Sequence, residues 1–147
     1  ENDTKLWKYS NRFHPYSKSL LNNYIASSDK DIFETRQIKF TITNKQKHAI
    51  GFIDLFDFEP LHHRAAIGLT ISSSNRGRGY GNASLELIEA YAKEMLQLHQ
   101  LYAHVAAENQ YSIQLFESQK FFLVGKKKDW NFYDGQFHDE LIYQKIV

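Results

Sequence analysis

The segment Ser73-Ser74-Asn75-Arg76-Gly77-Arg78-Gly79-Tyr80-Gly81 decides how this chain is interpreted. It follows an apolar stretch typical of a strand, Arg64 to Ser72, and it precedes the clearest amphipathic helix, Asn82 to Leu98. Glycine lets the backbone turn tightly, and its amide groups can approach an anion without interference from a side chain. A helix N-terminus adds unpaired N–H groups and a partial positive charge. The segment therefore predicts a loop that cradles a pyrophosphate, with bidentate support from Arg76 and Arg78.

Two common nucleotide-binding motifs fit this loop poorly. A Walker loop needs Gly-Lys-Ser/Thr at the start of the helix, where this chain has Gly81-Asn82-Ala83. A dinucleotide fingerprint needs G-x-G-x-x-G, whereas the glycines here occupy positions 77, 79 and 81. The phosphate carrier is thus of another kind.

The rest of the chain shows the periodicities of one mixed α/β domain with neither repeats nor linkers. A strand, a helix and a second strand in its middle imply a parallel crossover inside an otherwise antiparallel sheet. The predicted elements are a helix with Leu20, Leu21, Tyr24 and Ile25 on one side, strands from Ile38 to Thr43, His48 to Phe58 and Arg64 to Ser72, the helix Asn82 to Leu98, a strand Leu101 to Ala107, a helix Gln110 to Gln119, and strands Phe121 to Gly125 and Gln136 to Ile146 with Asp134-Gly135 as a turn signal between them.

Composition and charge narrow the classes of function. With 42% hydrophobic and 24% charged residues in 147, the chain is long enough for one core. It has no cysteine, which excludes disulfides, thiol nucleophiles and Cys-based metal sites and fits a reducing, cytoplasmic location. The net charge of +1 argues against a nucleic-acid partner, and no apolar run reaches membrane-spanning length. We expect neither a nucleic acid nor a membrane as partner, and we read Lys126-Lys127-Lys128 as a solvated loop.

The glycine segment also resembles a known family. Arg76-x-x-Gly79-x-Gly81 matches the R/Q-x-x-G-x-G/A motif of the GNAT superfamily of acetyl-CoA-dependent N-acetyltransferases. Glu108-Asn109-x-x-Ser112-x-x-Leu115-Phe116 is similar to that family's E-N-x-x-A/S-x-x-L-Y segment. His63-Arg64-Ala65 resembles the subgroup that acetylates ribosomal-protein alanine or spermidine. The resemblance runs from about Pro15 to the end of the chain and implies the GNAT fold: an α/β (α+β) domain with a mixed, mostly antiparallel sheet, one splayed parallel strand pair and helices on both faces.

The resemblance implies acetyl-CoA as co-substrate and assigns residues to it. In the family, the pantetheine arm binds the splayed strand, which here implicates Leu69, Thr70 and Ile71, and Asn109 bonds the same arm. The pyrophosphate would rest on the backbone of the loop, and position 116 would lie near the sulfur. The implied cofactor-binding residues are Leu69, Thr70, Ile71, Arg76, Gly77, Arg78, Gly79, Tyr80, Gly81, Asn109 and Phe116.

Two family positions are altered in this sequence. Many relatives carry R-A-E where this chain has Arg64-Ala65-Ala66, and a Tyr acid where it has Phe116. The usual base and the usual acid for the leaving thiolate are therefore both missing. The leading hypothesis is an N-acetyltransferase that moves an acetyl group to a primary amine, such as a polyamine or a protein N-terminus, by direct attack in a ternary complex. The alternative is a non-catalytic acyl-CoA-binding or regulatory module on the same fold.

Other residues are candidates for catalysis and acceptor binding. His104 lies in a strand that should border the splay, and a histidine suits general-base work near neutral pH; an ordinary strand histidine is the alternative. Asp54, in an acidic group with Asp57 and Glu59, and Tyr133, in a group of aromatic residues, are candidates for binding the amine, although solvated and packing roles are open. We assign no metal site, because His62 and His63 lack a third ligand at sensible spacing.

The ends of the fold carry the last expectations. We treat 1–147 as a single acetyltransferase-like domain. Residues Glu1 to Ser10 resemble the end of the family's first helix, so we expect the opening strand upstream of residue 1. A homodimer through the C-terminal strands is compatible with the family. The identity of the acceptor amine is left open by the sequence.

Overall fold

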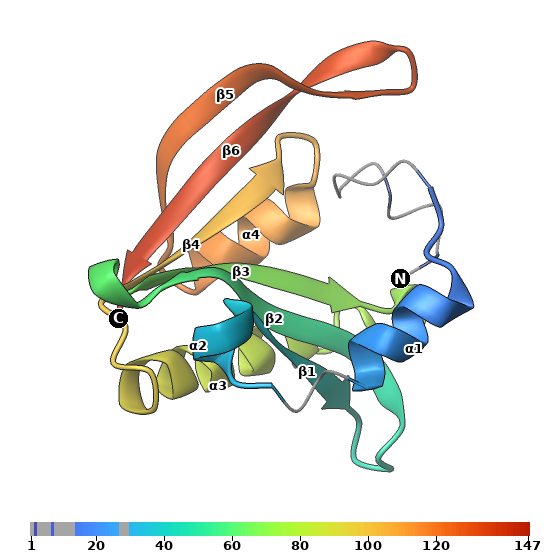
Figure 1. The fold of residues 1–147 in the computed structure, drawn as a ribbon. Helices are drawn as coiled ribbons and strands as arrows, with labels where there is room; N and C mark the ends of the chain where they lie inside the picture. Colours follow the sequence, from blue (N-terminus) through green and yellow to red (C-terminus); the bar gives the residue numbers. More distant parts are fainter. Residues whose placement is uncertain (1, 3–6, 8–13, 27–29) are drawn as a thin grey trace.

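A six-stranded sheet forms the centre of the molecule, with the strand order β1-β2-β3-β4-β6-β5 (Figure 1). The structure is a computed structural model that describes residues 2, 7, 14–26 and 30–147. Only β3 and β4 run parallel, and the other neighbouring pairs are antiparallel. The elements are α1 (Lys18–Ala26), α2 (Ile32–Thr35), β1 (Ile38–Thr43), β2 (Ala49–Glu59), β3 (Arg64–Ile71), α3 (Tyr80–Glu94), β4 (Gln100–Ala106), α4 (Gln110–Ser118), β5 (Phe122–Tyr133) and β6 (Gln136–Ile146).

The sheet has one apolar face, which packs on α3 and α4. Leu85, Ile88 and Ala92 of α3 and Phe116 of α4 are buried there. The strands contribute alternate residues to the same core, as the period of a half-buried strand requires. These are Ile53, Leu55, Ala65, Ile67, Leu101, Ala103, Val105 and Tyr143.

The other face of the sheet carries polar side chains, and we call it the polar face. The register places Asp54 opposite Gly68, Ala66 opposite Tyr102, and His104 opposite Ile142. Because paired residues lie on the same side of a sheet, Asp54, Tyr102 and His104 share this face. Glu140 joins them, since it is paired with Ala106, two residues beyond His104.

The predicted order of elements is confirmed, with differences at three places. Helix α3 begins at Tyr80 rather than Asn82 and ends at Glu94, before Leu98. The four-residue helix α2, whose N-cap Asp31 accepts the N–H of Phe33, was not predicted.

The third difference is larger: the loop predicted at Lys126-Lys127-Lys128 is wrong. Strand β5 continues through these lysines to Tyr133 and forms a long hairpin with β6. Lys126 and Lys127 form ion pairs with Asp139 and Glu140 of β6, and these pairs stabilise the charged segment as a strand. The turn at Asp134-Gly135 is confirmed, with positive φ at both residues.

Helix α1 contains all four residues that were predicted to share one side of a helix. The N–H of Leu20 in its first turn donates to Ser17 Oγ at 3.1 Å. The helix end expected over residues 1–10 lies largely outside the described residues. No helix in the described part of the chain is long and apolar enough to cross a membrane.

Candidate active site

The parallel strands β3 and β4 separate along their length. Their register joins Arg64–Ala66 to Gln100–Tyr102 and, within the continuously described range 30–147, it ends at the pair Ala66↔Tyr102. Beyond this pair β3 continues to Ile71 against β2, and β4 continues to Ala106 against β6. The facing edges therefore carry backbone N–H and C=O groups that no β3–β4 ladder uses. An extended arm with amide groups can bind at such an edge.

The three residues expected to bind the pantetheine arm lie in this splayed part of β3. Leu69 is half-buried and Thr70 is exposed. The carbonyl oxygen of Ile71 accepts a hydrogen bond from Nε of Arg76 at 3.0 Å. Arg76 thus ties the glycine loop to the end of β3, a structural contact that the sequence did not indicate.

The glycine loop has an unusual backbone and open space in front of it. Gly77 and Gly79 have φ values of 70° and 81°, and a Cβ added at either would meet nothing within 4 Å. Glycine is therefore needed there for its conformation and not for lack of room. Gly79 is the N-cap of α3, whose fully described first turn holds no acidic side chain. Orphan N–H groups facing open space fit an anion such as a pyrophosphate.

The remaining loop residues have different surroundings. Arg78 is exposed, and Tyr80 is half-buried as the first residue of α3. A Cβ at Gly81 would lie 3.1 and 3.2 Å from the two methyl carbons of Leu115. Gly81 therefore also lets α3 pack closely against α4.

Asn109 begins the helix that follows β4. Its side-chain oxygen accepts the N–H of Ser112 at 3.2 Å, which makes it the N-cap of α4. The cap uses the oxygen, so the NH₂ group of the side chain is still a possible donor to a ligand.

Phe116 lies in the core rather than on a surface. Its ring centroid is 5.1 Å from that of Phe121 and 6.4 Å from that of Tyr143. The Tyr143 hydroxyl donates to Glu117 Oε1 at 2.9 Å. Burial is the larger cause and this hydrogen bond to a carboxylate the next, and together they raise the pKa of Tyr143 to about 12. The phenol beside Phe116 is thus bonded to a carboxylate on α4.

Asp54 lies in the middle of β2, on the polar face. A Cβ at Gly68, its partner on β3, would lie 2.6 Å from Asp54 Oδ1. The carboxylate therefore lies directly over the backbone of β3, two residues past the last β3–β4 pair. A cationic group on the polar face would meet it close to the splay.

Tyr102 stands where the two strands separate, and the sequence did not indicate it. Burial raises the pKa of its phenol, with further increases from the charges of Asp57 and Glu59 and an opposing effect of Arg64. The charges of Asp57 and Glu59 thus both affect the phenol of Tyr102, which lies where β3 and β4 begin to separate.

His104 belongs to a charged cluster on the polar face. Its Nδ1 lies 3.1 Å from Glu140 Oε1, and Lys127 Nζ lies 3.0 Å from the same oxygen. Asn131 Nδ2 donates to Glu140 Oε2 at 3.3 Å. Lys127 Nζ also lies 4.4 Å from the ring centroid of Trp130. Strand β4 and the β5–β6 hairpin supply this cluster and meet only in the folded sheet, so sequence spacing held no signal for Glu140 or Lys127 as site residues.

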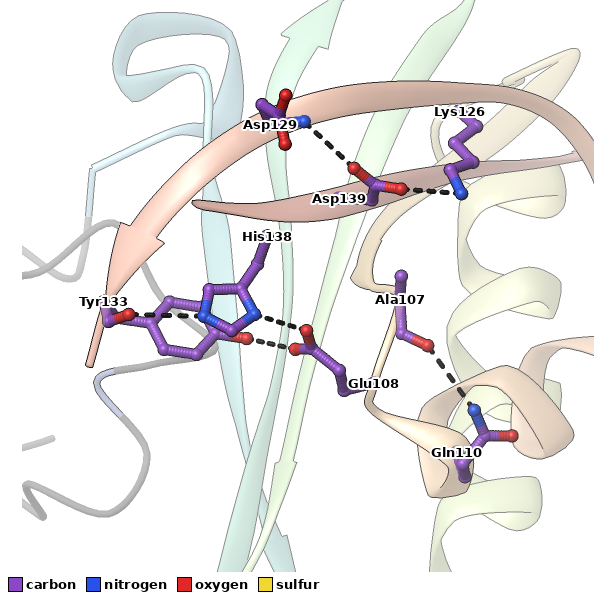
Figure 2. Close-up of polar contacts among 8 residues, drawn as sticks. All are labelled: Ala107, Glu108, Gln110, Lys126, Asp129, Tyr133, His138 and Asp139. Carbon is purple, nitrogen blue, oxygen red and sulfur yellow. Dashed lines mark hydrogen bonds and ion pairs between the residues drawn. The ribbon is translucent and has the colours of Figure 1, made fainter. Parts of the chain in front are cut away.

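Tyr133 is at the tip of the β5–β6 hairpin, where it meets the start of α4 (Figure 2). Its hydroxyl donates to one carboxylate oxygen of Glu108, and Nδ1 of His138 contacts the other. The rings of Tyr133 and His138 stack with their centroids 3.6 Å apart. These contacts link the hairpin tip to the residue preceding Asn109.

A second polar group holds the middle of the hairpin. Asp139 contacts Lys126 Nζ at 2.6 Å and accepts the backbone N–H of Asp129 at 2.9 Å (Figure 2). These contacts bridge the irregular stretch of β5 in which the register shifts between Lys127 and Asn131.

An apolar hollow of about 360 Å³ lies elsewhere, between β1 and α3. Its lining includes Phe40, Ile42, Ile88 and Tyr91 and holds no carboxylate, lysine, arginine or histidine. It is near the edge strand β1, so we do not place the reaction there.

Comparison with known proteins shows the family of this chain. The family model described as acetyltransferase (GNAT) domain matches residues 1–121. The chain belongs to the GNAT acetyltransferase family. The predicted family and fold class are thereby confirmed.

Two curated relatives show which members of the family this chain is similar to. Spermidine N(1)-acetyltransferase of Vibrio cholerae is 27% identical over 111 residues, which are 76% of this chain and 64% of that protein. The putative ribosomal N-acetyltransferase YdaF of Bacillus subtilis is 29% identical over 97 residues, 66% of this chain and 52% of that protein. The chain therefore spans less than two-thirds of the length of these relatives.

A solved GNAT structure has the same fold. The crystal structure of spermidine N-acetyltransferase from Vibrio cholerae in complex with CoA and spermine matches with a TM-score of 0.86. The match covers 99% of this chain and 84% of that one at 24% identity.

Proposed function

We propose that this protein is an acetyl-CoA-dependent N-acetyltransferase whose acceptor is a polyamine. The observation that carries the proposal is the β3–β4 splay. At the end of its β3 edge lies an anion cradle with open space before Gly77 and Gly79, and on the polar face beside it lie carboxylates. An anionic coenzyme and a cationic amine would thus approach one gap from two sides.

The residues of the loop would hold the coenzyme. The backbone N–H groups around Gly77 to Gly81 would bind the pyrophosphate, and the exposed Arg78 would add a charged contact. The splayed edge of β3 and the NH₂ group of Asn109 would bind the pantetheine arm. Acetyl-CoA supplies the acetyl group as a thioester, which is open to attack by a neutral amine.

The polar face would prepare the amine. Asp54, Asp57 and Glu59 would attract the ammonium groups of a polyamine, because opposite charges attract each other. Tyr133 at the hairpin tip would border the same acceptor. His104 would take the proton from the attacking nitrogen, because it is a histidine beyond the last β3–β4 pair and on this face.

The relatives support a polyamine over a protein N-terminus. The named activity of the Vibrio cholerae relative is spermidine N(1)-acetylation, and the solved neighbour is in complex with spermine. The Asp54 carboxylate on the polar face, together with the charges of Asp57 and Glu59 that raise the pKa of Tyr102, would suit an acceptor with several positive charges better than one with a single charge.

The test combines binding and turnover in one sample. Titration calorimetry with acetyl-CoA should show binding, and thiol release should follow addition of spermidine or spermine, with an Ala-starting peptide as the comparison amine. Release with the peptide alone would overturn the polyamine assignment. Binding with no release for any amine would favour the non-catalytic CoA-binding module, for which the buried Phe116 in place of an acid is the supporting observation.

A further inference from the structure

The carboxylate of Glu140 is buried and has three donors around it. Its residue is 9% exposed, and its oxygens are contacted by His104 Nδ1, Lys127 Nζ and Asn131 Nδ2 at 3.1, 3.0 and 3.3 Å. A buried carboxylate with this many donors is fixed in place. It can therefore impose an orientation on the one neighbour that has a choice of protonation site, His104.

The contact with Glu140 selects the tautomer of His104. A carboxylate only accepts, so Nδ1 must carry the proton that it donates to Oε1. Lys127 Nζ lies 3.4 Å from Nδ1 and, as a donor, would favour the opposite tautomer; the contact with Glu140 is shorter, at 3.1 Å, and its acceptor is a carboxylate, so it decides the tautomer. In the neutral ring the lone pair then belongs to Nε2, which has no hydrogen-bond partner among the described residues.

The imidazole is also partly accessible, as a group that takes a proton from a substrate must be. The His104 side chain is 31% exposed, whereas that of Glu140 is 11% exposed. Tyr102 packs edge-to-face against the imidazole with centroids 5.6 Å apart, which restricts its rotation. Tyr102 is also the last residue of β4 paired with β3, so the ring lies just past the start of the splay.

We infer that Glu140 is the positioning residue of the acetyl transfer: it fixes His104 as the Nδ1–H tautomer, with Nε2 turned toward the acceptor, and Lys127 holds the Glu140 carboxylate in place through its contact at 3.0 Å. In the reaction Nε2 would take a proton from the amine as the nitrogen forms its bond to the acetyl carbon and the thiolate leaves. This inference rests on the proposed acetyltransferase activity, but the tautomer can be measured without it.

The first readout is spectroscopic and uses the whole protein labelled with ¹⁵N-histidine. Two-bond ¹H–¹⁵N correlation spectra assign the tautomer of each ring, and a His104→Gln variant identifies the signal of His104. We expect the Nδ1–H form in the wild type and in Glu140→Gln, whose amide oxygen can still accept. Glu140→Leu should convert His104 to a mixture dominated by Nε2–H. Asp139→Asn, which removes the neighbouring carboxylate that contacts Lys126 instead, should leave the tautomer unchanged.

The second readout is steady-state kinetics with spermidine. Glu140→Leu should lower kcat by about 10- to 100-fold, as expected for a general base that loses its orientation, with little change in KM for acetyl-CoA. Glu140→Gln should recover part of this loss, and Asp139→Asn should retain kcat. An Nε2–H tautomer in the wild type, or a Glu140→Leu protein with unchanged tautomer and kcat, would overturn the inference. A wild type without turnover on any amine would overturn the proposed function instead, and the spectra would still decide the role of Glu140.

Discussion

Gly79 is at the position where the loop passes into α3, with φ of 81° and open space around it. We predict that Gly79→Ala lowers stability by about 1–2 kcal/mol, since an L-residue is strained in this conformation, and that it weakens acetyl-CoA binding severalfold by moving the N–H groups of the first turn. Gly135→Ala is the matched control, because Gly135 has a similar φ of 77° at the hairpin turn. Urea unfolding should show the same loss for both variants, and calorimetry a binding loss for Gly79→Ala alone. Equal affinities in the two variants would contradict the cradle.

Arg78 differs from Arg76 in its surroundings, and their substitutions should differ too. Arg76 donates to the Ile71 carbonyl, whereas Arg78 is exposed beside the two conformationally special glycines. Arg78→Ala should weaken acetyl-CoA binding by about 1.5–3 kcal/mol, the usual value of a hydrogen bond to a charged group, without altering stability. Lys93→Ala, which removes a positive charge near the other end of α3, is the control. Titration calorimetry at low and high salt measures both, and an unchanged affinity in Arg78→Ala would show that it lies outside the site.

Individual residues of the site were predictable to different degrees. The glycine loop follows from spacing, because a strand, a tight turn and a helix N-terminus are close in the chain; Asn109 was implied by the family resemblance. The link between His104 and Glu140 was not predictable, since it depends on which strands pair over a separation that local periodicity does not report. Spacing also could not show that Arg76 is bonded to Ile71 or that Gly81 packs on Leu115.

Among the elements, the β5–β6 hairpin departs most from its prediction. Half-buried strands are recognised by alternating polarity, but most of β5 after Gly125 is exposed, so its alternation is weak. Cross-strand ion pairs stabilise this part of β5: Lys126 pairs with Asp139, and Lys127 pairs with Glu140. The strands of the sheet centre were predicted well because their burial on the core face enforces the period of two.

The tie between β6 and α4 through Tyr143 and Glu117 gives a prediction for alkaline pH. The folded-state pKa of Tyr143, about 12, lies above the ordinary tyrosine value of 10.0. Folding therefore favours the protonated phenol, so this contribution is fully present below pH 10 and is lost as the pH rises toward 12. Two pKa units correspond to roughly 2–3 kcal/mol. About half of this contribution, on the order of 1.3 kcal/mol, should be lost from the wild-type free energy of unfolding between pH 9 and pH 11, as measured in urea.

Tyr143→Phe isolates this effect. The variant keeps the stacking on Phe116 and loses only the hydroxyl, so at pH 9 it should be less stable by about 0.5–1.5 kcal/mol, the value of one hydrogen bond. Its stability should then fall less between pH 9 and pH 11 than that of the wild type. The same decrease in both proteins would mean that another group carries the alkaline sensitivity.

At the level of the whole molecule, both proposals depend on the separation of β3 from β4. Because β3 and β4 separate within the sheet, one gap is open to the loop before α3 and to the polar face that bears His104 and Glu140. In the proposed function, this separation would bring a coenzyme and an amine together for direct attack without a covalent enzyme intermediate. With acetyl-CoA and spermidine both varied, initial rates should give intersecting double-reciprocal lines. Parallel lines would indicate an acetylated enzyme and contradict direct attack.

The outer edge of the sheet predicts self-association. Strand β5 is the last strand on its side, and its consecutive residues Phe122, Leu123 and Val124 are 71%, 54% and 56% exposed. An edge strand with apolar side chains readily pairs with another chain. We expect a homo-oligomer in sedimentation velocity, and Leu123→Lys with Val124→Lys should shift it toward the monomer. Leu61→Lys, a change at an 81% exposed apolar residue remote from β5 in the sheet order, should leave the oligomer intact. A wild type that sediments as a monomer at all concentrations would refute this use of β5.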